Sequence, residues 1–238
     1  DSGSYASSTT YITGKAVEMA CAKLKTQLCG IAAGMLGCST EEVVFENGRV
    51  KQINTEKSVS LAEISVKDQV NNDIAAVATA SHSSPVSPPP YMVGMVEIEL
   101  DKDTGEVKIL DYVAVVDCGI TINPALARIQ TEGGIVQGIG MALFEDVQYT
   151  DKGKIRNNSF MQYKIPSRMD IGKIRVDFES SYEESGPFGA KSIGELVIDT
   201  PCPALAEAIY NATGVRVREL PITPEKIAMG ILEKEMEK

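Results

Sequence analysis

A proline-rich segment over residues 81–90 (SHSSPVSPPP) limits the fold of this 238-residue chain more than any other feature. Its four prolines lack backbone N–H donors and fix φ, so the segment cannot lie inside a helix or a central strand. It must therefore be a linker or a covering loop. We expect two α+β subdomains, residues 1–90 and residues 91–238, and leave open whether the two halves interleave in space.

Hydrophobic periodicity predicts a mixture of helices and strands without a regular βαβ repeat, which indicates an α+β fold with mixed sheets and packed helices. Ser60 and Thr223 precede predicted helices as N-caps, and Gly37 and Gly214 follow predicted helices as stop signals. The predicted helices cover residues 13–36, 61–70, 123–144, 203–213 and a segment that begins at 224. The predicted strands cover residues 43–45, 48–53, 93–100, 107–116, 159–165 and 173–179, and the apolar run 112–116 is expected to be the more buried part of its hairpin.

Composition and charge exclude several classes of protein. With 23 Lys and Arg against 33 Asp and Glu, the net charge is −10, which disfavours nucleic acids and anionic membranes as partners. No apolar run approaches the roughly 18–20 residues that span a membrane, and no charged-then-apolar leader opens the chain, so we expect a cytoplasmic protein. The chain begins with Asp1 rather than Met, so we expect a fragment or a processed product whose site is incomplete.

The cysteines and the single histidine give no metal-binding pattern. The five cysteines contain no CxxC pair, and His82 has no cysteine or aspartate close to it in sequence. We therefore expect reduced thiols, and neither a zinc site nor a cysteine-ligated iron–sulfur cluster within this chain.

Two glycine-containing polar segments are candidates for ligand binding. The small residues of GSYASS (3–8) precede a helix and leave backbone N–H groups available to an anion, although a plain capped loop has the same composition. In EGGIVQGIG (132–140), Gln137 stands among glycines and apolar residues, where an unpartnered amide is costly. Its partner is either a ligand oxygen or a neighbouring backbone group. The glycines themselves favour a close approach by another backbone or a ligand.

A third segment, GPFGAKSIGE (186–195), carries the candidate base. Glu195 follows a flexible loop and precedes the apolar residues 196–198. A carboxylate held against apolar groups has a raised pKa, which suits a general base. The alternatives are a surface glutamate near a helix start for Glu195 and a solvated loop lysine for Lys191.

Six segments in one order carry a family resemblance that spans residues 3 to about 227. They are GSYASSTTYITGKAV, VVDCGITINPA, EGGIVQGIGMALFED, MQYKIPS, FGAKSIGE and LPITPEKI. Together they resemble the C-terminal part of the molybdenum-binding subunit of the xanthine dehydrogenase and aldehyde oxidase family. The resemblance implies the fold of the second molybdenum-cofactor-binding domain of molybdenum hydroxylases.

The resemblance also implies roles for individual residues. Glu195 matches the catalytic glutamate that takes a proton from a molybdenum-bound hydroxyl, and Gln137 matches the glutamine that hydrogen-bonds a molybdenum oxo group. The residues that match loops beside the metal and pterin are Ser4, Tyr5, Ala6, Ser7, Ser8, Lys191, Ser192 and Ile193. No protein side chain is expected to ligate the metal, because the pterin dithiolene holds it.

The activity that the resemblance implies is oxidative hydroxylation of an N-heterocycle or an aldehyde, with water as the oxygen source. The cofactor would be molybdenum–molybdopterin, with the cytosine dinucleotide form left open. The expected partners are the remaining half of the molybdenum subunit, iron–sulfur and flavin (FAD) domains or subunits that pass on the electrons, and a small-molecule substrate. We expect the chain to be inactive alone. The alternatives are a non-catalytic assembly or pterin-binding module of the same fold, and a plain pterin- or nucleotide-binding protein that binds tightly by itself.

Overall fold

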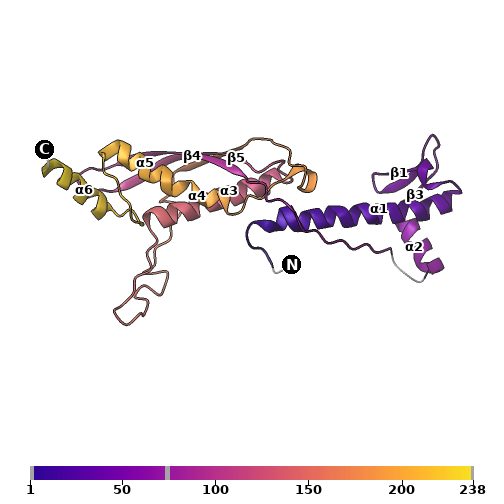
Figure 1. Cartoon of the computed structure of the whole chain (residues 1–238), viewed down its shortest axis with the longest axis horizontal. Helices are drawn as coiled ribbons and strands as arrows, with labels where there is room; N and C mark the ends of the chain where they lie inside the picture. Colours follow the sequence, from indigo (N-terminus) through magenta and orange to yellow (C-terminus); the bar gives the residue numbers. More distant parts are fainter. Residues whose placement is uncertain (1–2, 73–75, 237–238) are drawn as a thin grey trace. The chain divides into compact units, whose positions relative to one another are not determined.

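The computed structural model describes residues 3–72 and 76–236 and divides them into two compact units (Figure 1). One unit is Thr9–Pro85, and the second combines residues 3–8 with residues 86–236. The division into subdomains 1–90 and 91–238 stays a prediction. The two units differ from it because residues 3–8 group with the second unit and because the boundary between the units follows Pro85.

The first unit is a long helix packed on a small sheet. The fully buried residues Ala32, Val50 and Ile64 form its core, and the predicted stop at Gly37 is confirmed by its left-handed φ of 72°. The three-residue strand β3 was not predicted, because it is too short to show alternation. The elements are η1 (Thr9–Thr13, π-helical), α1 (Gly14–Leu36), η2 (Thr40–Glu42), the antiparallel strands β1 (Val43–Glu46), β2 (Arg49–Gln52) and β3 (Ser58–Ser60), and α2 (Leu61–Asn72).

The proline-rich segment forms neither helix nor strand, as predicted. The residues just before its prolines lie against the long helix region of the same unit. The Tyr11 hydroxyl and Ser84 Oγ are 2.8 Å apart, and Lys23 Nζ donates to the Thr79 carbonyl at 3.1 Å. Residues 79–84 are therefore a covering loop within the first unit, and the proline-rich segment continues into the second unit at Val86.

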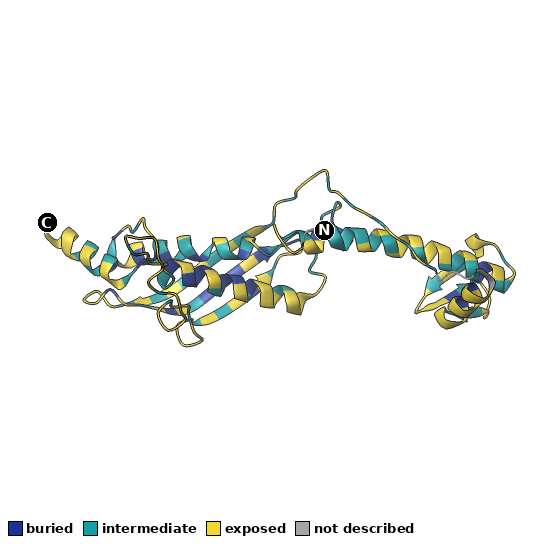
Figure 2. Ribbon diagram, turned by 90° about the horizontal axis from the view of Figure 1, so that it is seen from below, coloured by how far each residue is buried: buried dark blue, intermediate teal, exposed yellow. Residues whose placement is uncertain are grey.

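The second unit is a three-stranded mixed sheet with helices on one face. Strand β5 pairs antiparallel with β4 and parallel with β6. Residues of β5, α3 and α5 share one buried core, and Figure 2 shows buried positions gathered inside each unit. The elements are β4 (Tyr91–Leu100), β5 (Val107–Asp117), α3 (Pro124–Leu143), β6 (Lys173–Phe178), η3 (Pro187–Gly189), α4 (Leu196–Asp199), α5 (Pro201–Thr213) and α6 (Pro224–Met236). Among the described helices, none is long and apolar enough to cross a membrane.

Two expectations about strands need correction. The run 112–116 is more buried than β4 at Tyr112, Ala114 and Val116, as expected, but Val115 is 41% exposed because helices cover only one face of the sheet. The predicted strand 159–165 is wrong. These residues form turns in which backbone N–H groups donate to the Ser159 carbonyl, and the segment has no paired strand in the described part of the chain.

Two glycines of α3 allow it to pack closely on the short helix α4, as the sequence predicted. A Cβ placed at Gly134 would lie within contact distance of Val197 Cγ2 and 3.0 Å from Val197 Cβ. A Cβ placed at Gly138 would lie 2.7 Å from both the Ile198 carbonyl oxygen and Pro201 Cγ. Helix α3 therefore sits directly against the turn that follows Glu195.

We predict that Gly134→Ala destabilises the protein and that Gly133→Ala does not. The added methyl at 134 would push the buried Val197, at a cost of about 1–3 kcal/mol. At Gly133 a Cβ meets nothing within 4 Å, so alanine there should gain up to about 1 kcal/mol of helix propensity. Urea unfolding of the two variants measures the difference. Equal free energies of unfolding would contradict the packing argument.

Candidate functional site

The N-terminal loop and the predicted base lie in direct contact. Ser7 Oγ accepts a hydrogen bond from the Glu195 backbone N–H at 2.7 Å and donates one to Glu195 Oε2 at 3.2 Å. A Cβ at Gly194 would lie 3.1 Å from Ser7 Oγ, so glycine suits this approach. The structure thus brings together two segments that are 188 residues apart in sequence.

The backbone of the N-terminal loop is strained beside this contact. Ala6 and Ser7 have φ values of 47° and 53°, in the left-handed region that non-glycine residues rarely occupy. The Ser8 N–H donates to the Tyr5 carbonyl at 3.0 Å and closes the turn. Such conformations cost on the order of 1–3 kcal/mol each and cluster at functional sites. The strain therefore marks this turn as a candidate binding loop.

The loop that carries Glu195 is attached to the end of β5. The Ile120 N–H donates to the Gly189 carbonyl at 2.9 Å, and the Lys191 N–H donates to the Cys118 carbonyl at 2.8 Å. Within this loop Phe188, at φ 51°, is 64% exposed. Backbone hydrogen bonds therefore hold this loop in place. Its glycine content had suggested a flexible loop instead.

Lys191 is not solvated, contrary to one of the two interpretations of its loop position. Its Nζ lies 2.8 Å from Asp117 Oδ2, and the Lys191 side chain is only 10% exposed. Asp117 Oδ1 also accepts hydrogen bonds from Ser181 Oγ at 2.5 Å and from the Gly119 N–H at 3.0 Å. Partial burial by itself raises the pKa of Asp117, but the hydrogen bonds from Lys191, Ser181 and Gly119 outweigh it and lower the pKa below its usual value.

Two expectations about burial are wrong. Glu195 is exposed in this chain rather than held among apolar groups, although Val197 close behind it is fully buried. Gln137 is also exposed, because α3 turns Gly134 and Gly138 toward α4 and leaves the amide on the adjoining face. Both side chains are thus open to groups outside this chain.

The other predicted residues lie on the same two loops. Ser4, Tyr5 and Ala6 are exposed, and Ser7, Ser8, Lys191, Ser192 and Ile193 are half-buried. Asp117 was missed by the sequence reasoning, although a carboxylate at the end of an apolar strand just before Cys118-Gly119 was a usable signal. The roles of all these residues toward a cofactor stay predictions.

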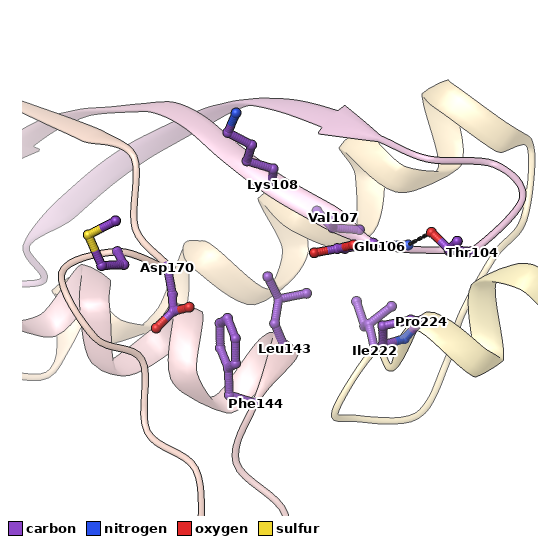
Figure 3. Close-up of a pocket in the computed structure, with 11 residues that line it drawn as sticks. Thr104, Glu106, Val107, Lys108, Leu143, Phe144, Asp170, Ile222 and Pro224 are labelled. Atoms are coloured by element: carbon purple, nitrogen blue, oxygen red, sulfur yellow. Dashed lines mark hydrogen bonds between the residues drawn. The ribbon is translucent and has the colours of Figure 1, made fainter.

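A pocket of about 590 Å³ lies elsewhere in the second unit (Figure 3). Thr104, Glu106 and Lys108, on the β4–β5 turn and the start of β5, line it opposite Leu143 and Phe144 at the end of α3. Its lining includes none of the residues predicted for cofactor binding. Across residues 3–72 and 76–236, no group of three or more His, Cys, Asp or Glu side chains could hold a metal ion.

Comparison with known proteins finds relatives that match almost the whole of this chain. A family model described as a molybdopterin cofactor-binding domain matches residues 1–172. A probable hypoxanthine oxidase of Escherichia coli is 34% identical over 98% of this chain and 24% of that protein. Subunit gamma of the 6-hydroxypseudooxynicotine dehydrogenase complex of Paenarthrobacter nicotinovorans is 34% identical over 94% of this chain and 30% of that protein. The chain thus spans 24–30% of the length of these two relatives.

Solved structures show the same fold. Quinoline 2-oxidoreductase from Pseudomonas putida 86 matches 96% of this chain and 30% of its own, with a TM-score of 0.86 and 28% identity. A copper- and molybdenum-containing CO dehydrogenase matches 99% of this chain and 31% of its own, with a TM-score of 0.87 and 22% identity. At that identity the second likeness supports the fold alone. The predicted α+β fold is confirmed.

We predict that Ser7→Ala loosens the Glu195 loop, whereas Ser8→Ala does not. The first change removes both hydrogen bonds to Glu195, each worth about 1 kcal/mol. Amide hydrogen exchange of a peptide covering 190–196 should therefore become roughly tenfold faster in the complete protein. Unchanged exchange in Ser7→Ala, or equal acceleration by both variants, would count against the contact.

Proposed function

Because the chain belongs to the molybdopterin cofactor-binding domain family, we propose that it forms part of the cofactor site of a molybdenum hydroxylase and supplies its general base, Glu195. The observation that supports the proposal is the pair of hydrogen bonds between Ser7 and Glu195, one donated by each residue, because they join the predicted cofactor loop to the loop of the predicted base.

The residues present fit molybdopterin as a ligand. The strained turn at Ala6 and Ser7 holds backbone groups in a fixed conformation at the surface, and the amide of Gln137 is exposed. A turn of this kind suits the phosphate and pterin groups of such a cofactor, because backbone N–H donors bind anions despite an acidic chain. In this proposal the chain supplies hydrogen-bond donors and a base, and the pterin itself would hold the metal.

Each residue then has a stated task. When bound, the cofactor supplies the redox centre that accepts two electrons from the substrate carbon. Glu195 accepts the proton that activates the oxygen nucleophile. Since Ser7 donates to Oε2, we assign proton transfer to Oε1. Gln137 donates a hydrogen bond to an oxygen of the bound group, from the helix that packs against the turn after Glu195.

The exposure of Glu195 fits a site that is completed by other protein. Proton transfer to a general base is favoured where bulk water is excluded, and a partner that covers Glu195 would exclude it. Relatives three to four times as long as this chain contain such additional protein. We therefore propose that the remainder of the molybdenum subunit covers the site and that the chain is inactive alone.

The proposed reaction is hydroxylation of an N-heterocycle or an aldehyde with water as the oxygen source. Relatives named for hypoxanthine, nicotine, quinoline and aldehyde substrates support this class. Electrons would leave through iron–sulfur clusters and a flavin or other acceptor on other domains or subunits, in the cytoplasm. The proposed cofactor is molybdenum–molybdopterin, with the pterin in its plain or its cytosine dinucleotide form.

In the complete enzyme, we expect Glu195→Gln to lower kcat by about 10²–10⁴-fold, the usual loss for a general base. Molybdenum content should stay unchanged, because an isosteric amide keeps the shape of the loop. Asp199→Asn is the matched control, since Asp199 is an exposed carboxylate four residues later, and it should keep full activity. Retained turnover in Glu195→Gln would remove Glu195 as the base.

A second prediction concerns Gln137. Gln137→Ala removes the proposed donor, so the rate or the molybdenum-to-protein ratio should fall, with a rate loss of about tenfold or more. Gln130→Ala, two turns earlier on the same exposed side of α3, should change neither quantity. Metal analysis and steady-state kinetics of both variants provide the comparison, and identical behaviour would exclude the role of Gln137.

A further inference from the structure

The end of strand β5 carries a half-buried polar junction that the proposed reaction does not use. We propose that Asp117 is a positioning residue, which fixes the loop of Glu195 by pairing with Lys191. This inference rests on the proposed function of Glu195, and it adds a residue to which the family resemblance gave no role. Asp117 itself has no task in the chemistry.

Asp117 joins three parts of the second unit to the end of β5. Its Oδ2 pairs with Lys191 Nζ at 2.8 Å, and its Oδ1 accepts from Ser181 Oγ and from the Gly119 N–H. These partners come from the Glu195 loop, from the segment after β6 and from the turn after β5. The Asp117 and Lys191 side chains are 21% and 10% exposed, so solvent screens this pair far less than a surface ion pair.

The pair closes a junction that the backbone already defines. The Lys191 N–H donates to the Cys118 carbonyl and the Ile120 N–H to the Gly189 carbonyl. Gly119, at φ 71°, leaves no room for a Cβ, which would lie 2.8 Å from the Lys191 nitrogen. The side-chain pair and the backbone bonds thus hold the same loop residue from both sides.

Glu195 is itself the second of two anchor points of its loop. The loop is anchored at Lys191 by Asp117 and at Glu195 by Ser7. Only three residues, 192–194, separate these anchors, so loss of the first anchor gives the carboxylate more freedom around the second. A base needs its oxygen within hydrogen-bond reach of the proton, so this freedom should lower the rate of proton transfer rather than substrate binding.

The same strand offers a matched control. Asp111 of β5 pairs with Arg175 of β6 at 2.6 Å and is about as exposed as Asp117, but Arg175 is 53% exposed and lies on a strand rather than on the Glu195 loop. Asp111→Asn removes an equivalent charge and hydrogen bond without releasing that loop. Any effect common to both aspartate variants is therefore a general effect of losing an ion pair.

The first test is independent of activity. In the complete protein, amide hydrogen exchange of a peptide covering 186–195 should become about tenfold faster in Asp117→Asn and in Lys191→Met. It should stay within about twofold of the native rate in Asp111→Asn. Lys191→Met keeps the length of the side chain and reports on the pair even if Asp117→Asn does not fold. Native exchange in both Asp117→Asn and Lys191→Met would overturn the proposal.

The second test separates positioning from folding and from catalysis by Glu195. In Asp117→Asn, kcat per bound molybdenum should fall about tenfold, while KM should stay within twofold of the native value. The double variant of Asp117→Asn and Lys191→Met should have a kcat no lower than that of the less active single variant, because both changes break the same pair. Lys191→Arg keeps the positive charge, so its kcat should lie between that of Lys191→Met and that of the native enzyme. Full kcat in Asp117→Asn, or a loss equal to that of Asp111→Asn, would overturn the positioning role. If Glu195→Gln also kept full activity, the proposed function would fail instead, while the exchange result would still stand.

Discussion

The hydrogen bond from the Glu195 backbone N–H to Ser7 Oγ is the contact on which the site depends. It joins the first described residues of the chain to a loop 188 residues later. Without it, the strained turn at Ala6 and the carboxylate of Glu195 would be two unrelated surface features. With it, the N-terminal loop belongs to the second unit, and the proposed base and the candidate cofactor loop share one location.

The rest of the second unit supports this location through close packing. Gly134 and Gly138 let α3 approach the turn that follows Glu195, so the helix that carries Gln137 cannot slide away from it. The Asp117–Lys191 pair holds the other end of the loop against β5. The scaffold is therefore rigid where the proposed chemistry needs rigidity, and Glu195 and Gln137 stay exposed where a cofactor and further protein would bind.

The sequence predicted those features that follow from local chemistry. Helix caps, the main hairpin and the close approach at the α3 glycines were predicted because each depends on the residues in one window. The exposure of Glu195 and the pairing of Lys191 were not, since both depend on groups far away in sequence. Asp117 lies 74 residues before Lys191. The wrong strand at 159–165 has the same cause, because a strand needs a partner that its own sequence does not contain.

A crystal structure of the complete protein, purified with its cofactor, tests the central claim most directly. We expect the pterin and metal to lie against the turn at Ser7, with Glu195 Oε1 facing the metal centre and the amide of Gln137 on the same side. A cofactor bound at any other place in the protein, or a Glu195 side chain directed into solvent in the loaded enzyme, would contradict the account.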